Sequence, residues 1–385
     1  MGDKILLVWS AVAFVTFATV AVLGYITSRG LIALVDVPPW QGPHFPRISI
    51  VVAARDEAKN VEQAARSLLS LDWPDLEIVM VDDRSRDGTG EILDRLAKQD
   101  QRLHVVHVTE LPPGWLGKNH ALQLGADAAT GGWILFTDGD VLFHPDTLRQ
   151  AVALANDHQL DHLTVGPEAP VPGLLLQAAI AGFGVFFSLF TRAWKLRDPH
   201  SSAHIGVGAF NLVRRAAYKR AGGHSALPLR PDDDLKLGKR LKETGCAQEI
   251  AMGRGRLSVE WYGSLREMAQ GLEKNSFASM EYSVPATVLA VVVVLLLFMA
   301  PFLGMAWTGG LPRILFGATY VLQALATAES ARRLGLDPWL GPMFPFSAGF
   351  LAYVVVRSMV VTLRTGGIRW RGTFYPLAEL KRNRV

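Results

Sequence analysis

The chain has 385 residues, of which 50% are hydrophobic, and its formal net charge is +4. This length and apolar share exceed those of one soluble domain and fit a membrane protein. The small basic excess is explained by the C-terminal tail, and the chain has no basic stripe with interleaved aromatic residues, so we expect no nucleic-acid binding. The single cysteine, Cys246, excludes an internal disulfide and fits a cytosolic location.

The N-terminal segment is apolar. Residues 5–27 carry no charge and are long enough to cross about 30 Å of hydrocarbon. Because no small-residue cleavage site follows, we expect residues 1–30 to form a membrane anchor that is not removed. Prolines around Trp40 indicate a linker over residues 31–45.

Strands and helices are expected to alternate in the next part of the chain, residues 46–281. Apolar runs that end in polar turns predict strands, and amphipathic stretches predict the helices between them. The expected strands are 47–54, 76–81, 103–108 and 133–137, and the expected helices are about 60–71 and 118–129. This alternation predicts a parallel α/β sheet, in which ligands bind at the carboxyl ends of the strands.

Acidic residues follow three of these strands, as Asp56-Glu57, Asp82-Asp83 and Asp138-Gly139-Asp140. Because the carboxyl ends of parallel strands meet at one edge of a sheet, these side chains should converge. Two carboxylates, Asp138 and Asp140, can hold a divalent cation from one side and leave the other side open for phosphate oxygens. Taken alone, this pattern is more typical of an Asp-rich turn.

Three motifs then occur in the order known from one enzyme family. Val81–Thr89 resembles V-D-D-x-S-x-D-G-T, Thr137–Asp140 contains a D-x-D, and Asp233–Leu241 resembles E-D-x-x-L-G-x-R-L. The chain resembles family 2 glycosyltransferases, the inverting nucleotide-sugar enzymes with the GT-A fold, over about Phe45 to Met280. The resemblance implies an α/β GT-A domain with a Rossmann-like, mostly parallel sheet.

The resemblance also implies roles for individual residues. Asp138 and Asp140 are expected to bind Mg²⁺ or Mn²⁺, and Asp234 lies where the family has its catalytic base. The family's Glu-Asp pair is Asp233-Asp234 here, so the base could instead be Asp233. The expected donor-binding residues, for a nucleotide sugar that we expect to be a UDP-sugar, are Ala54, Arg55, Glu57, Asp82, Asp83, Lys118 and Asp138. The expected acceptor-side residues are Gly208, Ala209, Phe210 and Asp233.

Some positions keep alternatives open. Arg55 stands where the family usually has an aromatic ring that stacks on the base, which leaves the nucleotide undecided. Lys118 could supply a positive charge at the start of a helix, and the alternative is a solvated surface lysine. His120 and His144 lie near the motifs, and we expect both to be structural.

Other segments resemble membrane-bound enzymes that glycosylate lipids such as carotenoids, hopanoids or sphingolipids. These segments are Pro112–Lys118 (P-x-G-W-x-G-K), Trp261–Met268 and Trp370–Tyr375 (W-[RK]-G-x-x-Y). They imply non-processive transfer of a sugar to a hydroxyl of a membrane lipid. Processive polysaccharide synthases carry Q-x-x-R-W, and its Arg-Trp is absent from Gln270–Lys274. A polysaccharide synthase and a non-catalytic membrane scaffold that kept the fold remain as alternatives.

Three uncharged stretches follow the motifs and predict two or three membrane segments within residues 282–364. They are residues 282–312, 314–328 and 338–356. Residues 171–191 are also apolar, but a span there would put Asp138 and Asp234 on opposite sides of the bilayer. We therefore expect an interfacial helix at 171–191, with a core helix packed on the sheet as the alternative.

The tail, residues 365–385, should be cytoplasmic because basic residues favour that side of a membrane. The basic residues of the tail are Arg369, Arg371, Lys381, Arg382 and Arg384. We expect a multi-pass protein of a bacterial-type inner (plasma) membrane, with the catalytic domain also cytoplasmic. Three crossings after that domain would put the tail outside, so one segment should fail to cross. Arg357, with Pro342 and Pro345, makes the last segment the candidate.

Overall fold

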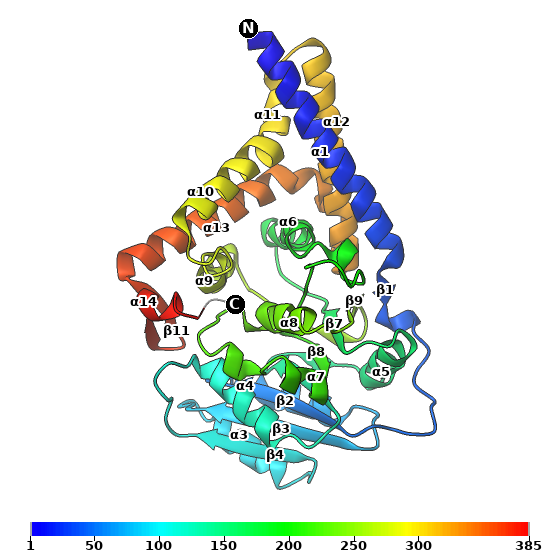
Figure 1. Cartoon of the computed structure of the whole chain (residues 1–385), viewed down its shortest axis with the longest axis vertical. Helices are drawn as coiled ribbons and strands as arrows, with labels where there is room; N and C mark the ends of the chain where they lie inside the picture. The colour runs from blue at the N-terminus through cyan, green and yellow to red at the C-terminus, as the bar shows by residue number, and fades with distance from the viewer. Residues whose placement is uncertain (1, 384–385) are drawn as a thin grey trace. The chain divides into compact units, whose positions relative to one another are not determined.

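The computed structural model describes residues 2–383, so Arg384 of the basic tail lies outside the described residues (Figure 1). The chain forms two compact units, each built from three separate stretches. The helical unit comprises Met1–Gly30, Pro170–Trp194 and Trp261–Ile368. The sheet unit comprises Leu31–Ala169, Lys195–Glu260 and Arg369–Val385. The contacts group the helix at 171–191 with the apolar helices and the basic tail with the sheet. The expected domain boundaries stay a prediction.

The sheet unit contains an eight-stranded sheet in the order β1-β9-β7-β8-β5-β2-β3-β4. All its described pairings are parallel except those of β8, which runs antiparallel to both β5 and β7. The strands are β1 Ile32–Ala33, β2 Ile48–Ala54, β3 Leu76–Asp83, β4 Leu103–Val108, β5 Trp133–Asp138, β7 His162–Gly166, β8 Asn211–Arg214 and β9 Gln248–Met252. Two small sheets pair β6 Leu142–Phe143 with β10 Leu257–Ser258, and β11 Gly367–Trp370 with β12 Thr373–Pro376. The predicted mostly parallel α/β sheet is confirmed.

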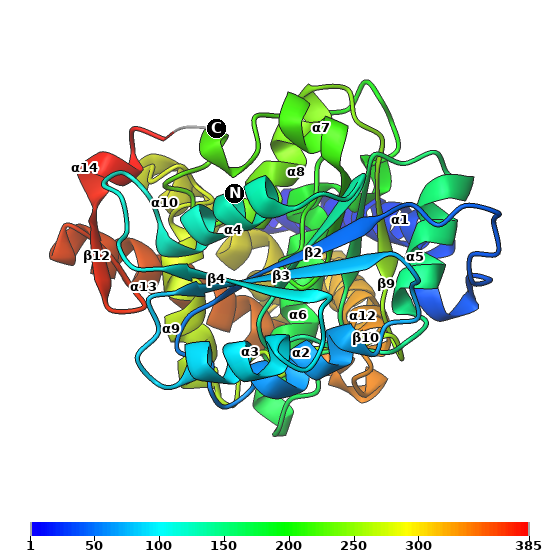
Figure 2. The same ribbon diagram turned by 90° about the horizontal axis from the view of Figure 1, so that it is seen from below.

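Helices cover both faces of this sheet. The helices of the sheet unit are α2 Val61–Leu69, α3 Thr89–Ala97, α4 Gly117–Ala128, α5 Thr147–Asp157, α7 Arg215–Arg220, α8 Asp233–Glu243 and, beside β12, the short α14 Leu377–Leu380. Along β2, Ile50 and Val52 share a core cluster with α2 and α3, whereas Val51 packs with Leu122 of α4. This follows from the alternation of side chains along a strand, and Figure 2 shows α2 and α3 on one face and α4 on the other.

The strand register brings the acidic residues to one edge of the sheet. Ala54 of β2 pairs with Asp82 of β3, and Ala53 pairs with Asp138 of β5. Because β5, β2 and β3 are neighbours in that order, their carboxyl ends lie side by side. The predicted convergence of the three acidic groups is therefore confirmed.

The helical unit holds α1 Gly2–Gly30, α6 Leu174–Thr191, α9 Leu265–Ser276, α10 Val284–Val293, α11 Ala300–Trp307, α12 Gly310–Arg333 and α13 Phe344–Thr365. Within the described part of the chain, four helical segments are long and apolar enough to cross a membrane, which suggests membrane association. They are Gly2–Ile26, Leu174–Lys195, Val284–Trp307 and Pro338–Thr365. The uncharged stretch 314–328 lies in α12, which is not one of the four.

A π-helical stretch, Val294–Met299, joins α10 to α11 and ends just before Pro301. Proline has no N–H, so the carbonyls of Leu296 and Leu297, five and four residues earlier, cannot receive a helical hydrogen bond from it. Both carbonyls instead accept from side chains of other helices, Leu296 from Trp9 Nε1 and Leu297 from Gln323 Nε2, each at 3.1 Å. An apolar environment demands such partners for every backbone group.

Candidate active site

The loops that follow β2 and β3 are tied to each other by hydrogen bonds. The Asp87 carboxylate accepts from the backbone N–H of Ala58 at 2.9 Å and of Thr89 at 3.1 Å. The Thr89 hydroxyl in turn accepts from the backbone N–H of Glu57 at 2.9 Å. Asp56 adopts φ 53°, a left-handed conformation that turns the chain sharply after the strand. These bonds fix Glu57 at the carboxyl edge of the sheet.

Asp82 and Asp83, at the end of β3, are both engaged by nearby side chains. Asp82 lies 3.1 Å from His107 Nδ1 and accepts from the Ser85 N–H at 3.2 Å. Asp83 is buried, and both its oxygens receive bonds from Arg84, at 2.7 and 3.0 Å. The Arg55 guanidinium lies 3.6 Å from Asp83. Arg55, which stands where the family usually has an aromatic ring that stacks on the nucleotide base, thus contacts an acid.

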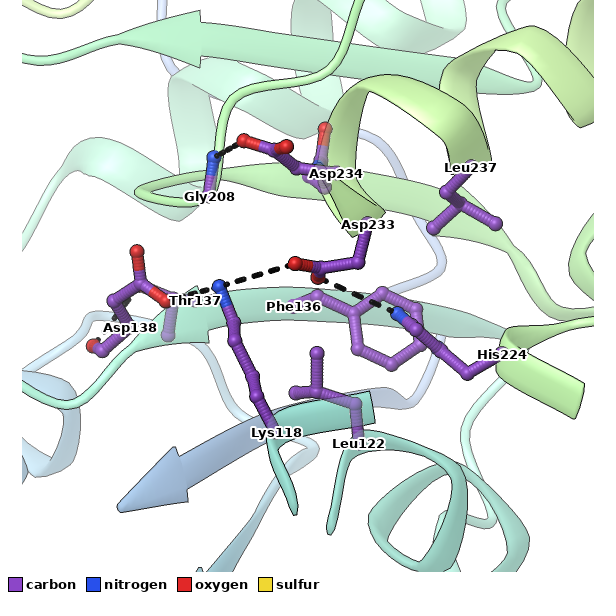
Figure 3. Close-up of a pocket in the computed structure, with 11 residues that line it drawn as sticks. Lys118, Leu122, Phe136, Thr137, Asp138, Gly208, His224, Asp233, Asp234 and Leu237 are labelled. Carbon is purple, nitrogen blue, oxygen red and sulfur yellow. Dashed lines mark hydrogen bonds and ion pairs between the residues drawn. The ribbon is translucent and has the colours of Figure 1, made fainter. Parts of the chain in front are cut away.

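A small pocket lies beside Asp138 (Figure 3). It is lined by Lys118, Leu122, Phe136, Thr137, Asp138, Gly208, Asn211, His224, Asp233, Asp234 and Leu237. Lys118 Nζ lies 2.7 Å from Asp138 and 3.7 Å from Asp233. Burial alone would lower the pKa of Lys118, but the surrounding carboxylates raise it well above its usual value. Lys118 is therefore a charged member of the site and not a solvated surface lysine.

The acids around Asp138 repel one another. Burial, together with the charges of Asp138 and Glu57, raises the pKa of Asp140 to about 6. Burial likewise raises the pKa of Glu57, against the opposing effect of Arg371 and with a further rise from Asp138. Crowded carboxylates of this kind are oxygen ligands of the type that Mg²⁺ and Mn²⁺ prefer. Among the described residues no group of three or more acid, histidine or cysteine side chains could by itself hold a metal ion.

Three successive aspartates begin α8, and the structure separates them. Asp232 forms a two-point ion pair with the buried Arg230, at 2.9 Å for each bond. Asp233 is buried beside Lys118 and lies 3.9 Å from His224 Nε2. Asp234 is partly exposed and accepts from the Gly208 N–H at 2.8 Å, and burial raises its pKa. Of the three, Asp234 is best placed to meet a substrate.

Close backbone packing places Asp234 near Asp138. A Cβ on Gly206 would lie 1.9 Å from the carbonyl oxygen of Asp234, and one on Gly238 would lie 1.8 Å from that of Ile205. A Cβ on Gly208 would lie 2.6 Å from Asp138 Oδ2 and 3.5 Å from Asp234 Oδ2. Because Gly206 and Gly238 have no side chain, the segment before β8 packs directly against α8. The carboxylates of Asp138 and Asp234 then lie on either side of Gly208.

Other predicted site residues contribute backbone only. Ala54 and Phe210 are fully buried in the main core, where the Phe210 ring packs near Phe143. The carbonyl of Ala209 accepts from the Thr137 hydroxyl at 2.8 Å. The buried Ala54 and Phe210 side chains are not available to a substrate, and the roles of these three residues stay a prediction. His144 caps a turn by accepting from the Asp146 N–H, as a structural residue does.

Sequence reasoning missed several contributors. Asn119 ties α4 to the loop before α8 by donating to the carbonyls of Leu227 and Arg230. Arg371 and Tyr375, from the C-terminal β11–β12 segment, contact Glu57 and Gly117 respectively. The Trp370–Tyr375 motif was the available signal for the last two residues, but nothing local predicts which partner they reach.

One region of the chain matches a known family. Residues 49–222 match the model of Glycosyl transferase family 2. The matched region includes the acidic groups of β2, β3 and β5 and also Gly208. This region, which is less than half of the chain, is thus similar to family 2 glycosyltransferases.

Related proteins share this region with the chain. The chain is 31% identical over 105 residues to the putative teichuronic acid biosynthesis glycosyltransferase TuaG of Bacillus subtilis, covering 27% of this chain and 40% of that protein. It is 32% identical over 161 residues to a beta-monoglucosyldiacylglycerol synthase of Trichormus variabilis, covering 38% of this chain and 34% of that protein. The chain thus spans less than half the length of these relatives.

A solved structure supports the fold over nearly the whole chain. The mannosyltransferase PcManGT of Pyrobaculum calidifontis, solved with GDP-Man and Mn²⁺, matches with a TM-score of 0.50 and 20% identity. The match covers 94% of this chain and 91% of that one. The predicted GT-A fold, with long apolar helices near the N-terminus and in the C-terminal region, is confirmed.

Proposed function

We propose that this protein transfers one sugar from a nucleoside diphosphate sugar, a UDP-sugar, to a hydroxyl group of a membrane lipid, with inversion at the anomeric carbon. The observation that carries the proposal is the placement of Asp138 and Asp234 on either side of Gly208. Inverting transfer needs a site for the donor phosphates and a base that faces the acceptor hydroxyl. One pocket holds a candidate for each.

The donor side is built from Lys118, Asp138 and Asp140. The crowded oxygens of Asp138 and Asp140 fit Mg²⁺ or Mn²⁺, which when bound would neutralise charge on the leaving diphosphate. Lys118 adds a permanent positive charge beside Asp138, at 2.7 Å, and this charge favours departure of an anionic leaving group. Arg55, Asp82 and Asp83 lie at the neighbouring strand ends, where the nucleoside would bind.

The acceptor side is built around Asp234. Its carboxylate would take the proton of the acceptor hydroxyl as that oxygen attacks the anomeric carbon from the face opposite the diphosphate. Burial raises the pKa of Asp234, which makes the carboxylate a stronger base than an ordinary aspartate. Asp233 is held by Lys118 and His224 in the pocket wall, so we assign it the role of positioning Lys118.

A lipid acceptor is favoured by the apolar helices that share the chain with this domain. Two cyanobacterial relatives are named beta-monoglucosyldiacylglycerol synthases, and such a product is a glycolipid. Other relatives are named for polymers, as teichuronic acid, and they keep the polysaccharide synthase as the second candidate. The missing Arg-Trp after Gln270 speaks against that candidate, and the retained acids speak against a non-catalytic scaffold.

Extraction of labelled product tests the acceptor class. Membranes that contain the protein are incubated with radiolabelled nucleotide sugars and Mg²⁺ or Mn²⁺, then extracted with organic solvent. We expect label in the organic phase, one sugar per lipid, and about 10²- to 10⁴-fold slower labelling in membranes that contain Asp234→Asn at equal abundance. Label in a water-soluble or high-molecular-weight polymer would reject the lipid acceptor and restore the synthase.

We further propose that the protein is a multi-pass protein of the inner (plasma) membrane, with the sheet unit and the tail both cytoplasmic. The tail belongs to the sheet unit, through contacts such as Asn383 with the N–H of Leu229 at 3.1 Å. An even number of crossings must therefore separate Glu260 from Arg369. If Val284–Trp307 crosses, one later helix must return.

We assign the return to α12. Its 24 residues span about 36 Å at 1.5 Å each. Its polar Thr319, Gln323 and Thr327 lower its hydropathy, but they are buried in the helical unit and need not face lipid. In α13, Arg357 pairs with Glu273 of the amphipathic α9 at 3.0 Å, a charge pair that suits the interface better than hydrocarbon.

Cysteine labelling in intact cells distinguishes the two topologies. Trp307 and Trp339 are highly exposed, at 81% and 86%, and flank α12. With Cys246 replaced by Ser, a membrane-impermeant maleimide should label Trp307→Cys but not Trp339→Cys. Labelling of both would mean that the Pro338–Thr365 segment makes the return crossing instead of α12.

A further inference from the structure

The C-terminal hairpin ends in an unusual turn. β11 and β12 form a two-stranded sheet and are linked by only Arg371 and Gly372. Both residues have positive φ, 47° and 78°, as in a type I′ turn. Glycine adopts this conformation freely, but an arginine there is strained. Backbone strain of this kind persists where the surrounding structure holds it, often at ligand-binding positions.

The hairpin is fixed on the sheet unit by contacts that do not involve Arg371. The buried Tyr375 accepts, through its hydroxyl, the N–H of Gly117 at 3.3 Å. Gly117 is the first residue of α4, next to Lys118. Further along, Asn383 accepts from the N–H of Leu229 at 3.1 Å and donates to the carbonyl of Ala226 at 3.3 Å. The turn at Arg371 is therefore presented to the site by a segment that is anchored independently.

At the tip of this hairpin, the Arg371 guanidinium donates to the Glu57 carboxylate, 314 residues away in the sequence. The Arg371 side chain is 46% exposed and that of Glu57 is 18% exposed. Glu57 also feels the charge of Asp138 and raises the pKa of Asp140. The guanidinium thus lies at the border of the carboxylate group that we assign to the donor phosphates, with much of its surface open to solvent.

We propose that Arg371 is a donor-binding residue, which exchanges Glu57 for the diphosphate of the nucleotide sugar. The inference rests on the proposed function. An arginine fork binds two phosphate oxygens at once, and a diphosphate carries more negative charge than a single carboxylate. In the free protein Glu57 pairs with the guanidinium and compensates its charge. In the complex Arg371 and Lys118 supply positive charge from two elements, the hairpin and α4.

Binding of nucleotides to the full-length protein in detergent tests the proposal without any acceptor. Calorimetry with Mg²⁺ compares Arg371→Gln with Arg369→Gln, which removes the same charge from the same hairpin. Arg369 lies over the Phe374 ring at 5.6 Å and is exposed. We expect Arg371→Gln to weaken the affinity for UDP about 10- to 100-fold, the usual range for losing a charge-assisted hydrogen bond. The affinity for UMP should fall less, and Arg369→Gln should match the wild type.

Comparison in a second background separates phosphate binding from charge compensation. If Arg371 only neutralises Glu57, then Glu57→Gln should restore UDP affinity to the Arg371→Gln protein. If Arg371 binds phosphate, replacing it with Gln should lower the affinity for UDP by the same factor in both backgrounds. The loss from Glu57→Gln to the double variant should then equal the loss from wild type to Arg371→Gln. Restored affinity overturns the proposal, as does an equal loss for UDP and UMP.

Two further controls complete the experiment. Arg371→Lys keeps the charge but not the fork, so we expect an intermediate affinity, and thermal melting shows whether each variant is folded. Should Arg371→Gln melt early, Arg371→Lys carries the test, and wild-type affinity in that variant would overturn the fork contact. Wild-type protein that binds neither UDP nor any nucleoside diphosphate would reject the proposed function itself, whereas unchanged binding by a folded Arg371→Gln rejects only this inference.

Discussion

Gly208→Ala should damage catalysis while leaving the fold intact. The added Cβ would lie 2.6 Å from Asp138 Oδ2, whereas ordinary contact begins at 3.4 Å. The Asp138 carboxylate must therefore move by about 0.8 Å. Its side chain is 40% exposed and can rotate toward solvent, so the free energy of unfolding should change by less than about 1 kcal/mol.

The functional cost of that shift follows from the position of Asp138. A displacement of about 1 Å in a group that positions reactants can lower the rate about 100-fold. We therefore expect kcat of Gly208→Ala to fall about 10- to 100-fold. The contact between Asp138 and Lys118, 2.7 Å in the wild type, should lengthen as well. The Gly208 N–H survives the substitution, so its bond to Asp234 is kept.

Gly139→Ala is the matched control, since it adds the same methyl group inside the Asp138-Gly139-Asp140 turn. A Cβ there would meet nothing closer than 3.6 Å, the distance to the Ala53 carbonyl. Initial rates of sugar transfer at saturating donor, with thermal melting of each purified variant, measure both effects. Wild-type activity in Gly208→Ala would refute the steric argument, and so would an equal loss in Gly139→Ala.

Three further outcomes are expected. Asp138→Asn, Asp140→Asn and EDTA treatment of the wild type should each abolish transfer, and full activity in chelator would exclude a metal role. Asp234→Asn should lower kcat about 10²- to 10⁴-fold, the typical contribution of a general base, with nearly unchanged UDP binding. If Asp233→Asn shows that pattern and Asp234→Asn does not, the base is one residue earlier. Because burial raises the pKa of Asp234, kcat should rise with pH through a value above that of an ordinary aspartate, and a flat acid limb would contradict its role as base.

The carboxyl edge of the sheet could be predicted because its signals are local. The strands β2, β3 and β5 are mostly apolar and have six to eight residues, and acids stand at or shortly after the end of each. Parallel pairing then brings those ends together without any further information. The register between Ala53 and Asp138 is what such reasoning implies.

The separation of Asp232, Asp233 and Asp234 could not be predicted in this way. It depends on which side chains surround the start of α8, namely Arg230, Lys118 and the Gly208 backbone, and these come from distant segments. The close approach at Gly206 and Gly238 likewise becomes visible only when the two backbones are seen within contact. The motif could place the acids but not assign their partners.

The apolar helices show where prediction from hydropathy fails. Hydropathy selects Leu174–Lys195 as a possible span and passes over α12, because it averages over all sides of a helix. In α12 the polar Gln323 is buried and donates to the carbonyl of Leu297 that Pro301 leaves free. A polar residue that hydrogen-bonds to a neighbouring helix lowers the mean hydropathy of its own helix. It also supplies a partner for a backbone group that would otherwise be unsatisfied in an apolar environment.

The C-terminal hairpin is a further case in which the sequence identifies a segment but not its contacts. The sequence shows that Trp370–Tyr375 is a motif and that the tail is basic. From the number of basic residues alone, Arg371 would be interpreted only as one of the cations that favour the cytoplasmic side of a membrane. Its pairing with Glu57 instead places it beside the acids at the strand ends. The proposals for donor binding and for membrane topology both use this contact, because a tail that reaches the strand ends must lie on the same side of any membrane as the sheet unit.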